Sequence, residues 1–505
     1  MANEHLGLCL STFLLWACIP AVAASAPGDA GGRTLEALPP PVINPRSTEI
    51  CMNSRLSYHG GWTAAGTEQM LADVLHAAAS ARATGMPLTI YAATAENVYI
   101  YDAVNHALVL HRAGSWRSDA TAAFEVGFAA PSTIDAGAAM HLAQLESVAL
   151  WTGTANQLAS CPRASAATYA NANWNPIEPI DIAVSFGMRS VAGLTTSLAA
   201  VSSDGTLPDP ITDGPVFLDD ALDALAYDST FAATSLTPAE VSQILWAAYG
   251  CSNHYASGGK AGLVCSSAVA NYYLTRRVYM VGVEGVHRFH NRRPPGTDMT
   301  TRDHRVEVVR TGDARLALRT AVPRLPDAPQ YVIVCAGSTG AWQELEVGFV
   351  AMGALLAASS MDLQAHWTQA LSAAEQAAVR EATGLPAADI PMTLVSVGRP
   401  ADVSVLDPRE GRAPAPELTI ENRLAAGGGV TVRYALVAES EVELAVYDCT
   451  GHALRQLVDS WQGPGPHESL WDGRDRREQP VPSGVYFFRL KAGRLARSAQ
   501  VVIVR

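Results

Sequence analysis

The sequence predicts two related α+β units in tandem, packed as a pseudo-dimer within one chain and followed by a small all-β domain. The tandem is predicted because residues 51–190 and 217–400 each contain a helix, a strand pair, a long helix rich in small residues and a closing apolar strand, in that order. The β domain is predicted because the chain beyond residue 416 alternates between apolar and polar side chains with a period of two. Two unrelated α/β domains are the alternative, which the shared order of elements disfavours.

The composition indicates packed globular domains. The chain has 505 residues, of which 49% are apolar and 16% charged, and this length corresponds to about three domains. The formal net charge is −13. Because phosphate binding requires a basic patch, this acidic balance argues against a nucleic-acid partner.

The N-terminus has the features of a leader. Residues 6–17 are almost wholly apolar, and Ala21-Val22-Ala23-Ala24 supplies small residues for cleavage, so we expect a signal peptide over 1–24 and a linker over 25–46. No Lys or Arg precedes Arg33, which leaves a buried N-terminal helix as one alternative, and Cys18 leaves a lipoprotein as another. We expect an exported protein, periplasmic or extracellular, with no transmembrane span after leader removal.

The cysteines and histidines suggest no metal centre. Export would permit disulfides, and Cys51 with Cys161 or Cys251 with Cys265 are conceivable pairs, although connectivity cannot be read from sequence. The chain contains no CxxC or HExxH pattern. The histidines that flank the Arg/Pro-rich stretch near residue 293 are interpreted as part of a solvated loop; they are His287, His290 and His304.

The domain boundaries follow from composition and periodicity. We predict a first unit over 47–190, a linker over 191–215, a second unit over 216–400, a linker over 401–416 and the β domain over 417–505. In the first unit the expected elements are a helix at 68–78, strands at 87–93 and 97–101, a long helix at 135–150 and a strand at 180–187. Their counterparts are 237–248, 277–281, 285–289, 346–358 and 392–398, with Thr237, Pro238 and Glu240 forming a helix N-terminal signature.

Both units resemble the flavin-dependent nitroreductase family, in particular its SagB-type dehydrogenase branch. The residues that carry the resemblance are Leu245-Trp-Ala-Ala-Tyr-Gly250, the stretch 268–271, residues 97–108, and the acid-x-Gly start of each long helix at Asp135/Gly137 and Glu346/Gly348. The resemblance covers about two thirds of the chain and rests on the order of these weak motifs. It implies FMN held between two copies, with hydride passing from NAD(P)H to the flavin and then to a small-molecule substrate.

The resemblance also implies which residues hold the flavin. The family's phosphate-binding Arg/Ser stretch matches Arg55 and Ser57 in the first unit, whereas the second unit keeps only Ser229, beside Asp228. The family's Pro-Ser-Ala-x-x-Asn-like loop matches only the second unit, although its Pro is missing. We therefore expect a single flavin site between the units, with the cofactor-binding residues Arg55, Ser57, Arg189, Lys260, Ser266, Ser267 and Asn271.

The C-terminal domain resembles the FlgD-type immunoglobulin-like domain. The matching stretches are Val446-Tyr-Asp448, Trp471-Asp-Gly-Arg-Asp475 and Pro482-Ser-Gly-Val-Tyr-Phe487, and Trp471 is the expected core anchor. The expected architecture is a β-sandwich, which we interpret as a spacer, a sorting tail, or a stability or interaction module without chemistry.

Two functions remain open from the sequence. The first is an exported FMN-dependent oxidoreductase that uses NAD(P)H or another electron donor and is monomeric because the dimer is fused. The second is a degenerate, non-catalytic binding or structural protein with the same fold, which the lost arginines and the missing first-unit loop favour. Fold-level analogy does not decide between them.

Overall fold

The computed structural model describes residues 35–55, 57, 61–63, 66–151, 156–190, 207–226, 230–255, 261–267, 271–292, 302–401, 417–421, 429–436, 438–448, 451–493 and 495–504. The predicted signal peptide lies outside these residues, as do Lys260, Asp228 and Ser229 and most of the two predicted interdomain linkers. Within the described part of the chain, no helix combines the length and the apolar character needed to cross a bilayer.

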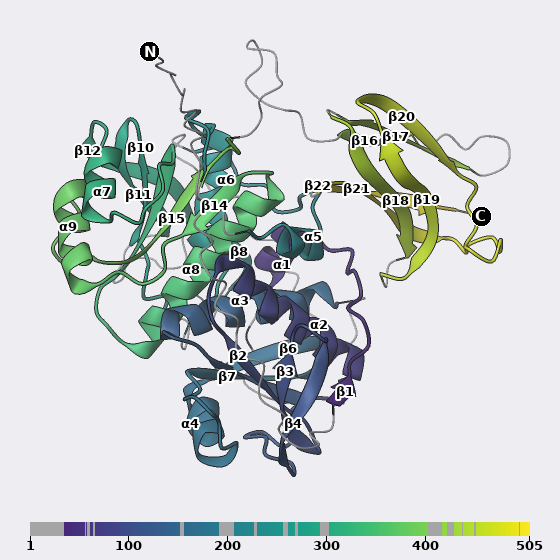
Figure 1. Cartoon of the computed structure of the whole chain (residues 1–505), viewed down its shortest axis with the longest axis horizontal. Helices are drawn as coiled ribbons and strands as arrows, with labels where there is room; N and C mark the ends of the chain where they lie inside the picture. The colour runs from purple at the N-terminus through teal and green to yellow at the C-terminus, as the bar shows by residue number, and fades with distance from the viewer. Residues whose placement is uncertain are drawn as a thin grey trace, which may run out of the picture.

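Each α+β unit is built on an antiparallel sheet (Figure 1). The first sheet has the order β1 (Leu35–Ala37), β4 (Ala107–Ala113), β3 (Asn97–Asp102), β2 (Thr89–Ala93), β5 (Phe124–Ala129), β7 (Ile182–Ser190), β6 (Asn156–Arg163). The second has the order β12 (Arg302–Thr311), β11 (Gly285–Arg292), β10 (Val278–Gly282), β13 (Gln330–Ala336), β15 (Ile390–Gly398), β14 (Gln364–Trp367). Apart from the additional β1, the strands of the two sheets correspond one to one, which confirms the predicted pair of related units.

Four helices of each unit also correspond in order along the chain. The first unit contains α1 (Thr48–Ser54), α2 (Glu68–Ser80), η1 (Ala81–Thr84), α3 (Thr133–Ala149) and α4 (Ala164–Asn173). The second contains α5 (Leu218–Asp223), α6 (Pro238–Tyr249), α7 (Arg315–Ala321), α8 (Ala341–Ser360) and α9 (Ala373–Thr383), together with the small hairpin β8 (Cys251–Tyr255) and β9 (Ala261–Leu263). The predicted capping box at Thr237 and Glu240 begins α6, with Pro238 in its first turn.

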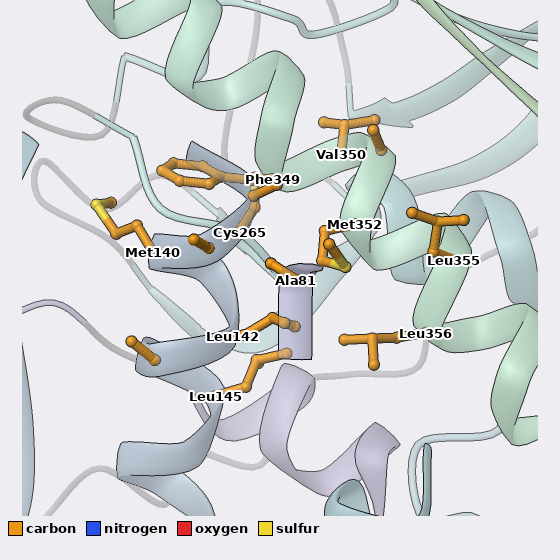
Figure 2. Packing of buried hydrophobic residues seen from close by; sticks show 14 of the residues in the cluster. Ala81, Met140, Leu142, Leu145, Cys265, Phe349, Val350, Met352, Leu355 and Leu356 are labelled. Carbon is orange, nitrogen blue, oxygen red and sulfur yellow. The ribbon is translucent and has the colours of Figure 1, made fainter. Parts of the chain in front are cut away.

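The long helices α3 and α8 pack directly against each other at the centre of the body. Leu142 and Leu145 of α3 and Met352 and Leu356 of α8 lie in the space between the two helices (Figure 2). Because both helices are buried on nearly every face, neither shows a clear amphipathic stripe. One hydrophobic core therefore runs through both units, and each unit has a smaller buried cluster of its own.

Two glycines set the distance between these helices. A Cβ on Gly137 would lie 2.4 Å from the Leu345 carbonyl oxygen, and a Cβ on Gly348 would lie 2.0 Å from the Ile134 carbonyl oxygen. Each contact joins a glycine to the residue three positions before the other glycine, so the two contacts are equivalent under the internal pseudo-symmetry. Any side chain at either position would force the helices apart.

The pseudo-symmetry is repeated where the first helix of each unit begins. Ser47, before α1, forms an antiparallel bridge with Phe217, before α5. Leu218 N donates to Arg46 O at 3.0 Å, and Thr48 N donates to Val216 O at 3.0 Å. The two chain entries are therefore joined by a reciprocal pair of backbone hydrogen bonds.

The segment that enters the first unit is tied down along its length. β1 pairs with β4, the Leu38 amide donates to His106 O at 3.1 Å, and the Val42 amide donates to Asp73 Oδ1 at 3.0 Å. Residues 35–46, which the sequence assigns to a linker, are therefore packed on the body.

The C-terminal domain is the predicted β-sandwich. One sheet has the order β16 (Glu417–Glu421), β17 (Val430–Leu436), β20 (Gly465–Trp471), and the other has the order β19 (Ala453–Gln462), β18 (Ser440–Asp448), β21 (Gly484–Ala492), β22 (Leu495–Ile503). Trp471 is fully buried and packs edge-on against Tyr486 and Phe488, as expected of a core anchor. The sequence did not predict β16 or β20.

The sandwich is docked on the body rather than held apart as a spacer (Figure 1). Arg489 of β21 forms a buried ion pair with Asp220 of α5, and Arg497 of β22 pairs with Asp362. The Ser498 amide also donates to Pro215 O at 2.9 Å. These contacts correct the expectation of a spacer, because a spacer has no buried charge pair with its neighbour.

The interpretation of the three histidines as part of a solvated loop is also wrong. His287 and His290 lie in β11 and His304 lies in β12, and His290 and His304 are buried. The cause is the hairpin formed by β11 and β12, whose inward side chains are covered by the rest of the unit. The five described cysteines are buried thiols outside any disulfide, so neither conceivable pair is joined.

Candidate functional site

The candidate site lies at the seam between the two units, which we define as residues 55–57 of the first unit, residues 263–267 of the second, and the facing surfaces of α3 and α8. Arg55 follows α1 directly as its C-terminal cap residue. The 263–267 stretch begins at the end of β9. The contact of α1 with the β8–β9 hairpin brings the two stretches together.

Arg55 is 2% exposed and spans the boundary between the units. A guanidinium carries five N–H groups, and each of these groups in Arg55 donates to an oxygen of the chain. The acceptors are Val264 O at 3.1 Å, Ser57 Oγ at 3.2 Å, Ser266 Oγ at 2.9 Å, Leu263 O at 3.3 Å and Cys265 O at 2.7 Å. Four of the five acceptors belong to the second unit, so Arg55 fixes the conformation of the 263–266 backbone.

The hydrogen bonding continues from Arg55 into α3 and β6. Ser57 Oγ and Ser266 Oγ are 3.2 Å apart, and Ser266 Oγ donates to Gln144 Oε1 at 2.7 Å. Gln144 Nε2 in turn donates to Ser160 Oγ at 3.1 Å. These five side chains form a connected polar network inside an otherwise apolar core, and Ser57 is its exposed end.

A second network surrounds Glu346 at the start of the buried part of α8. Its carboxylate accepts from the Ser267 hydroxyl, from Tyr249 Oη at 2.8 Å and from the Tyr273 amide at 2.9 Å. Burial raises the pKa of Glu346 to about 7. Ser267 is therefore committed to its own unit, whereas its neighbour Ser266 faces Arg55.

His141 is buried in the seam, and neither of its ring nitrogens has a hydrogen-bond partner among the described residues. Its ring lies 5.7 Å, centroid to centroid, from that of Phe349 on α8. Burial, together with the nearby charge of Arg55, lowers the pKa of His141 to about 3. His141 is therefore neutral at physiological pH and cannot act there as an acid.

The structure places the remaining predicted residues at the edge of the seam or away from it. Asn271 is exposed, and its amide donates to Tyr273 Oη at 2.9 Å. Arg189 lies on β7, where its partner in the sheet is Gln157, three residues before Ser160. Lys260 lies outside the described residues.

These positions test whether the predicted residues fit a flavin phosphate. Arg55 does not fit as a phosphate ligand, because no N–H of its guanidinium is left to donate. The other described candidates are Ser57, whose hydroxyl lies between Arg55 and Ser266, together with Asn271 and Arg189. Together they offer the hydroxyl, amide and cationic groups that a phosphate accepts from.

Sequence reasoning missed Gln144, Ser160 and His141. Gln144 and His141 are polar residues within a helix that is otherwise mostly Ala and Leu on its buried faces, and this was the available signal. Ser160 gave no signal, because a lone serine in a strand is ordinary. Its place in the network depends on Gln144 reaching it from another element.

Comparison with models of protein families gives no match, and comparison with curated protein sequences gives none either.

Comparison with solved structures gives partial likenesses. A candidate nitroreductase from Anabaena variabilis is 11% identical and covers 70% of this chain and 87% of its own, with a TM-score of 0.44. A candidate nitroreductase from Ralstonia eutropha is 21% identical and covers 41% and 96%, with a TM-score of 0.32. FlgD from P. aeruginosa is 21% identical and covers 18% and 69%, with a TM-score of 0.14. Each is a likeness to part of this chain, and none assigns it an activity.

Proposed function

We propose that the two units form one FMN-dependent oxidoreductase of the nitroreductase kind, related to the SagB-type dehydrogenases, with a single flavin site at the seam. The supporting observation is the contact between Arg55 and Ser266, 2.9 Å across the unit boundary. It joins the first-unit stretch that resembles the family's phosphate motif to the second-unit loop that resembles its flavin-contacting loop. The symmetric second site would need the same loop from the first unit, which has no such loop. We therefore propose one site rather than two.

In this proposal the predicted residues divide into two roles. Ser57, Arg189 and Asn271, with Lys260, bind the cofactor. Arg55 is a positioning residue, because its bonds to the 263–266 backbone shape the loop, and Ser267 anchors the same loop to Glu346. A bound FMN would supply hydride transfer between NAD(P)H, or another electron donor, and a small-molecule substrate.

The proposal also includes the location and assembly of the protein. The leader-like N-terminus supports export to the periplasm or beyond, and the continuous core between the units supports a working monomer. NAD(P)H is scarce outside the cytoplasm. An exported enzyme of this kind would therefore require another electron donor.

The test is the absorbance and fluorescence spectrum of the purified full-length chain, before and after incubation with FMN. The expected result is a flavin spectrum that survives gel filtration, and its loss in the double variant Ser57→Ala/Asn271→Ala. Both residues are exposed, so this variant is expected to unfold like the wild type. A wild-type chain that neither carries nor takes up FMN would overturn the proposal.

One observation favours a second candidate, a non-catalytic binding or structural protein that retains the fold. The guanidinium of Arg55, the expected phosphate ligand, donates all five N–H groups to the chain itself. For this candidate the purified chain is colourless, and titration with FMN produces no heat and no spectral change.

A further inference from the structure

A cavity of about 580 Å³ lies where the β-sandwich meets the body, at the point where α1 and α5 begin. Its lining residues come from four separate stretches, which lie within 44–50, 149–151, 213–217 and 485–500. It shares no residue with the stretches 55–57 and 263–267 of the seam. A volume of this size at a domain boundary is typical of a small-molecule site.

The sandwich forms one wall of this cavity because it is docked. Phe487 of β21 and Phe217 of the body stand edge to face, with ring centroids 6.0 Å apart, and both line the cavity. The Ser498 amide donates to Pro215 O at 2.9 Å in the same wall. Behind them, the buried Arg489–Asp220 ion pair holds β21 against α5. The cavity is therefore a product of the assembled chain and belongs to neither domain alone.

Arg46 supplies the positive charge that lines the cavity. Its Nε and Nη2 both donate to Trp151 O, at 2.9 and 2.6 Å, which fixes the plane of the guanidinium. Nη1 has no hydrogen-bond or ion-pair partner among the described residues. A guanidinium oriented in this way, with one nitrogen undonated, is suited to a carboxylate.

Asp213 supplies the negative charge. Its Oδ1 accepts from Ser47 Oγ at 3.3 Å, and it lies at the exposed rim of the cavity. Ser498 Oγ, in the facing wall, is buried without a hydrogen-bond partner.

The rest of the lining offers aromatic surface. Trp151, Phe217 and Phe487 line the cavity together with Ile50 and Val485. Planar side chains of this kind bind the faces and edges of aromatic groups. The cavity thus combines one cation, one anion and an aromatic wall.

We propose that this cavity binds a small zwitterion with an aromatic side group, that is, an aromatic amino acid or a short peptide that carries one. The carboxylate contacts Arg46 Nη1, the ammonium lies towards Asp213, and the aromatic group packs against Trp151 and Phe487. The proposal goes beyond the flavin proposal and does not depend on it. Because the site requires the docked sandwich, it gives the C-terminal domain a part in ligand binding.

The test compares three probes by isothermal titration calorimetry with the full-length chain. L-phenylalanine carries both charges, 3-phenylpropanoate carries only the carboxylate, and 2-phenylethylamine carries only the ammonium. The expected order of affinity places L-phenylalanine first. Absence of binding at millimolar L-phenylalanine would overturn the proposal, as would a single-charge probe that binds equally well or better.

Two variants locate the binding. Arg46→Gln is expected to weaken L-phenylalanine binding about tenfold or more, since a charge-assisted contact is lost. Gln500 of β22 lines the cavity and pairs in the sheet with Phe487, so both side chains lie on the cavity face. Gln500→Trp is therefore expected to fill the cavity and abolish binding.

Gln456→Trp makes the same substitution at an exposed position of β19 outside the cavity, and it is the matched control. Thermal unfolding curves confirm that the variants fold. Binding that survives in folded Gln500→Trp shows that the ligand sits elsewhere, and this overturns the proposal even where Arg46→Gln weakens affinity.

Discussion

Arg55 Nη1 of the first unit lies 2.9 Å from Ser266 Oγ of the second, across the boundary between the two related halves of the chain. The two residues are 211 positions apart in sequence. Their contact is part of a fully bonded guanidinium that joins the units, and it makes Arg55 a structural residue whatever ligand the seam holds.

Arg55→Met is expected to lower the free energy of unfolding by about 3 kcal/mol, because buried carbonyl oxygens at 263–265 lose their donors while the side-chain volume is nearly kept. Arg55→Lys should lose less, since an ammonium offers three donors. Urea unfolding followed by tryptophan fluorescence measures both.

The control for this prediction is Arg433→Met. Arg433 pairs with Glu468 on the exposed face of the sandwich, and its loss should change stability by no more than about 0.5 kcal/mol. Equal stabilities for Arg55→Met and the wild type would contradict the role assigned to Arg55.

Gly348→Ala is expected to destabilise the body by about 2 kcal/mol or more. The new Cβ would lie 2.0 Å from the Ile134 carbonyl oxygen, so α3 and α8 must separate along a well-packed interface. Gly463→Ala is the matched control, because a Cβ at Gly463 meets nothing within 4 Å. A melting temperature that is the same for both variants would show that the helix crossing tolerates a methyl group.

Glu146→Gln is expected to leave stability nearly unchanged at about pH 4 and to increase it at about pH 8. Burial, with Asp219 and Asp73 nearby, raises the pKa of Glu146 well above 4.5. The folded state therefore holds this proton more tightly than the unfolded state, and the stabilisation is lost as pH rises above 4.5. Glutamine keeps the acceptor for Asn44 Nδ2, 2.8 Å from Glu146 Oε1, and cannot ionise.

The readout for Glu146→Gln is the difference in urea midpoint between the variant and the wild type across this pH range. The difference is needed because burial lowers the pKa values of His141 and His304, to about 3 and about 4, and these groups give the opposite slope. A difference that stays constant with pH would contradict the assignment.

Arg489→Met is expected to release the sandwich from the body. It leaves Asp220 buried without its cation, a loss of about 3 kcal/mol for a pair of this kind. Small-angle scattering should show a larger radius of gyration, and the two parts should unfold in separate transitions. Lys491→Met is the control, because Lys491 pairs with a half-exposed Asp223 and its loss should leave the scattering unchanged.

The main elements of both units could be predicted because their signals are local. Helical patterns and runs of small residues indicated α2, α3, α6 and α8, and period-two alternation beyond residue 416 indicated strands of the sandwich. Strands such as β5 and β14 were missed, because a short buried run carries no period that separates it from other buried segments. The capping residues Thr237 and Glu240 gave the start of α6 correctly for the same local reason.

The candidate site could be predicted only in part. The sequence brought Arg55, Ser57 and Ser266 together by analogy, and the structure places them in one network. It could not indicate that Arg55 would use all five N–H groups on the chain, or that Gln144 would join the network, because those bonds depend on how a neighbouring unit is placed.

By itself, the sequence determined that the chain contains two related α+β units and a β-sandwich, since the order and periodicity of elements are written residue by residue. Only the tertiary structure decided that Gly137 and Gly348 bring the two long helices into contact, that Arg489 docks the sandwich on Asp220, and that His304 is buried in a hairpin. Each of these outcomes depends on side chains that meet from distant parts of the chain. Steric contact and buried charge act between neighbours in space, which local sequence patterns do not record.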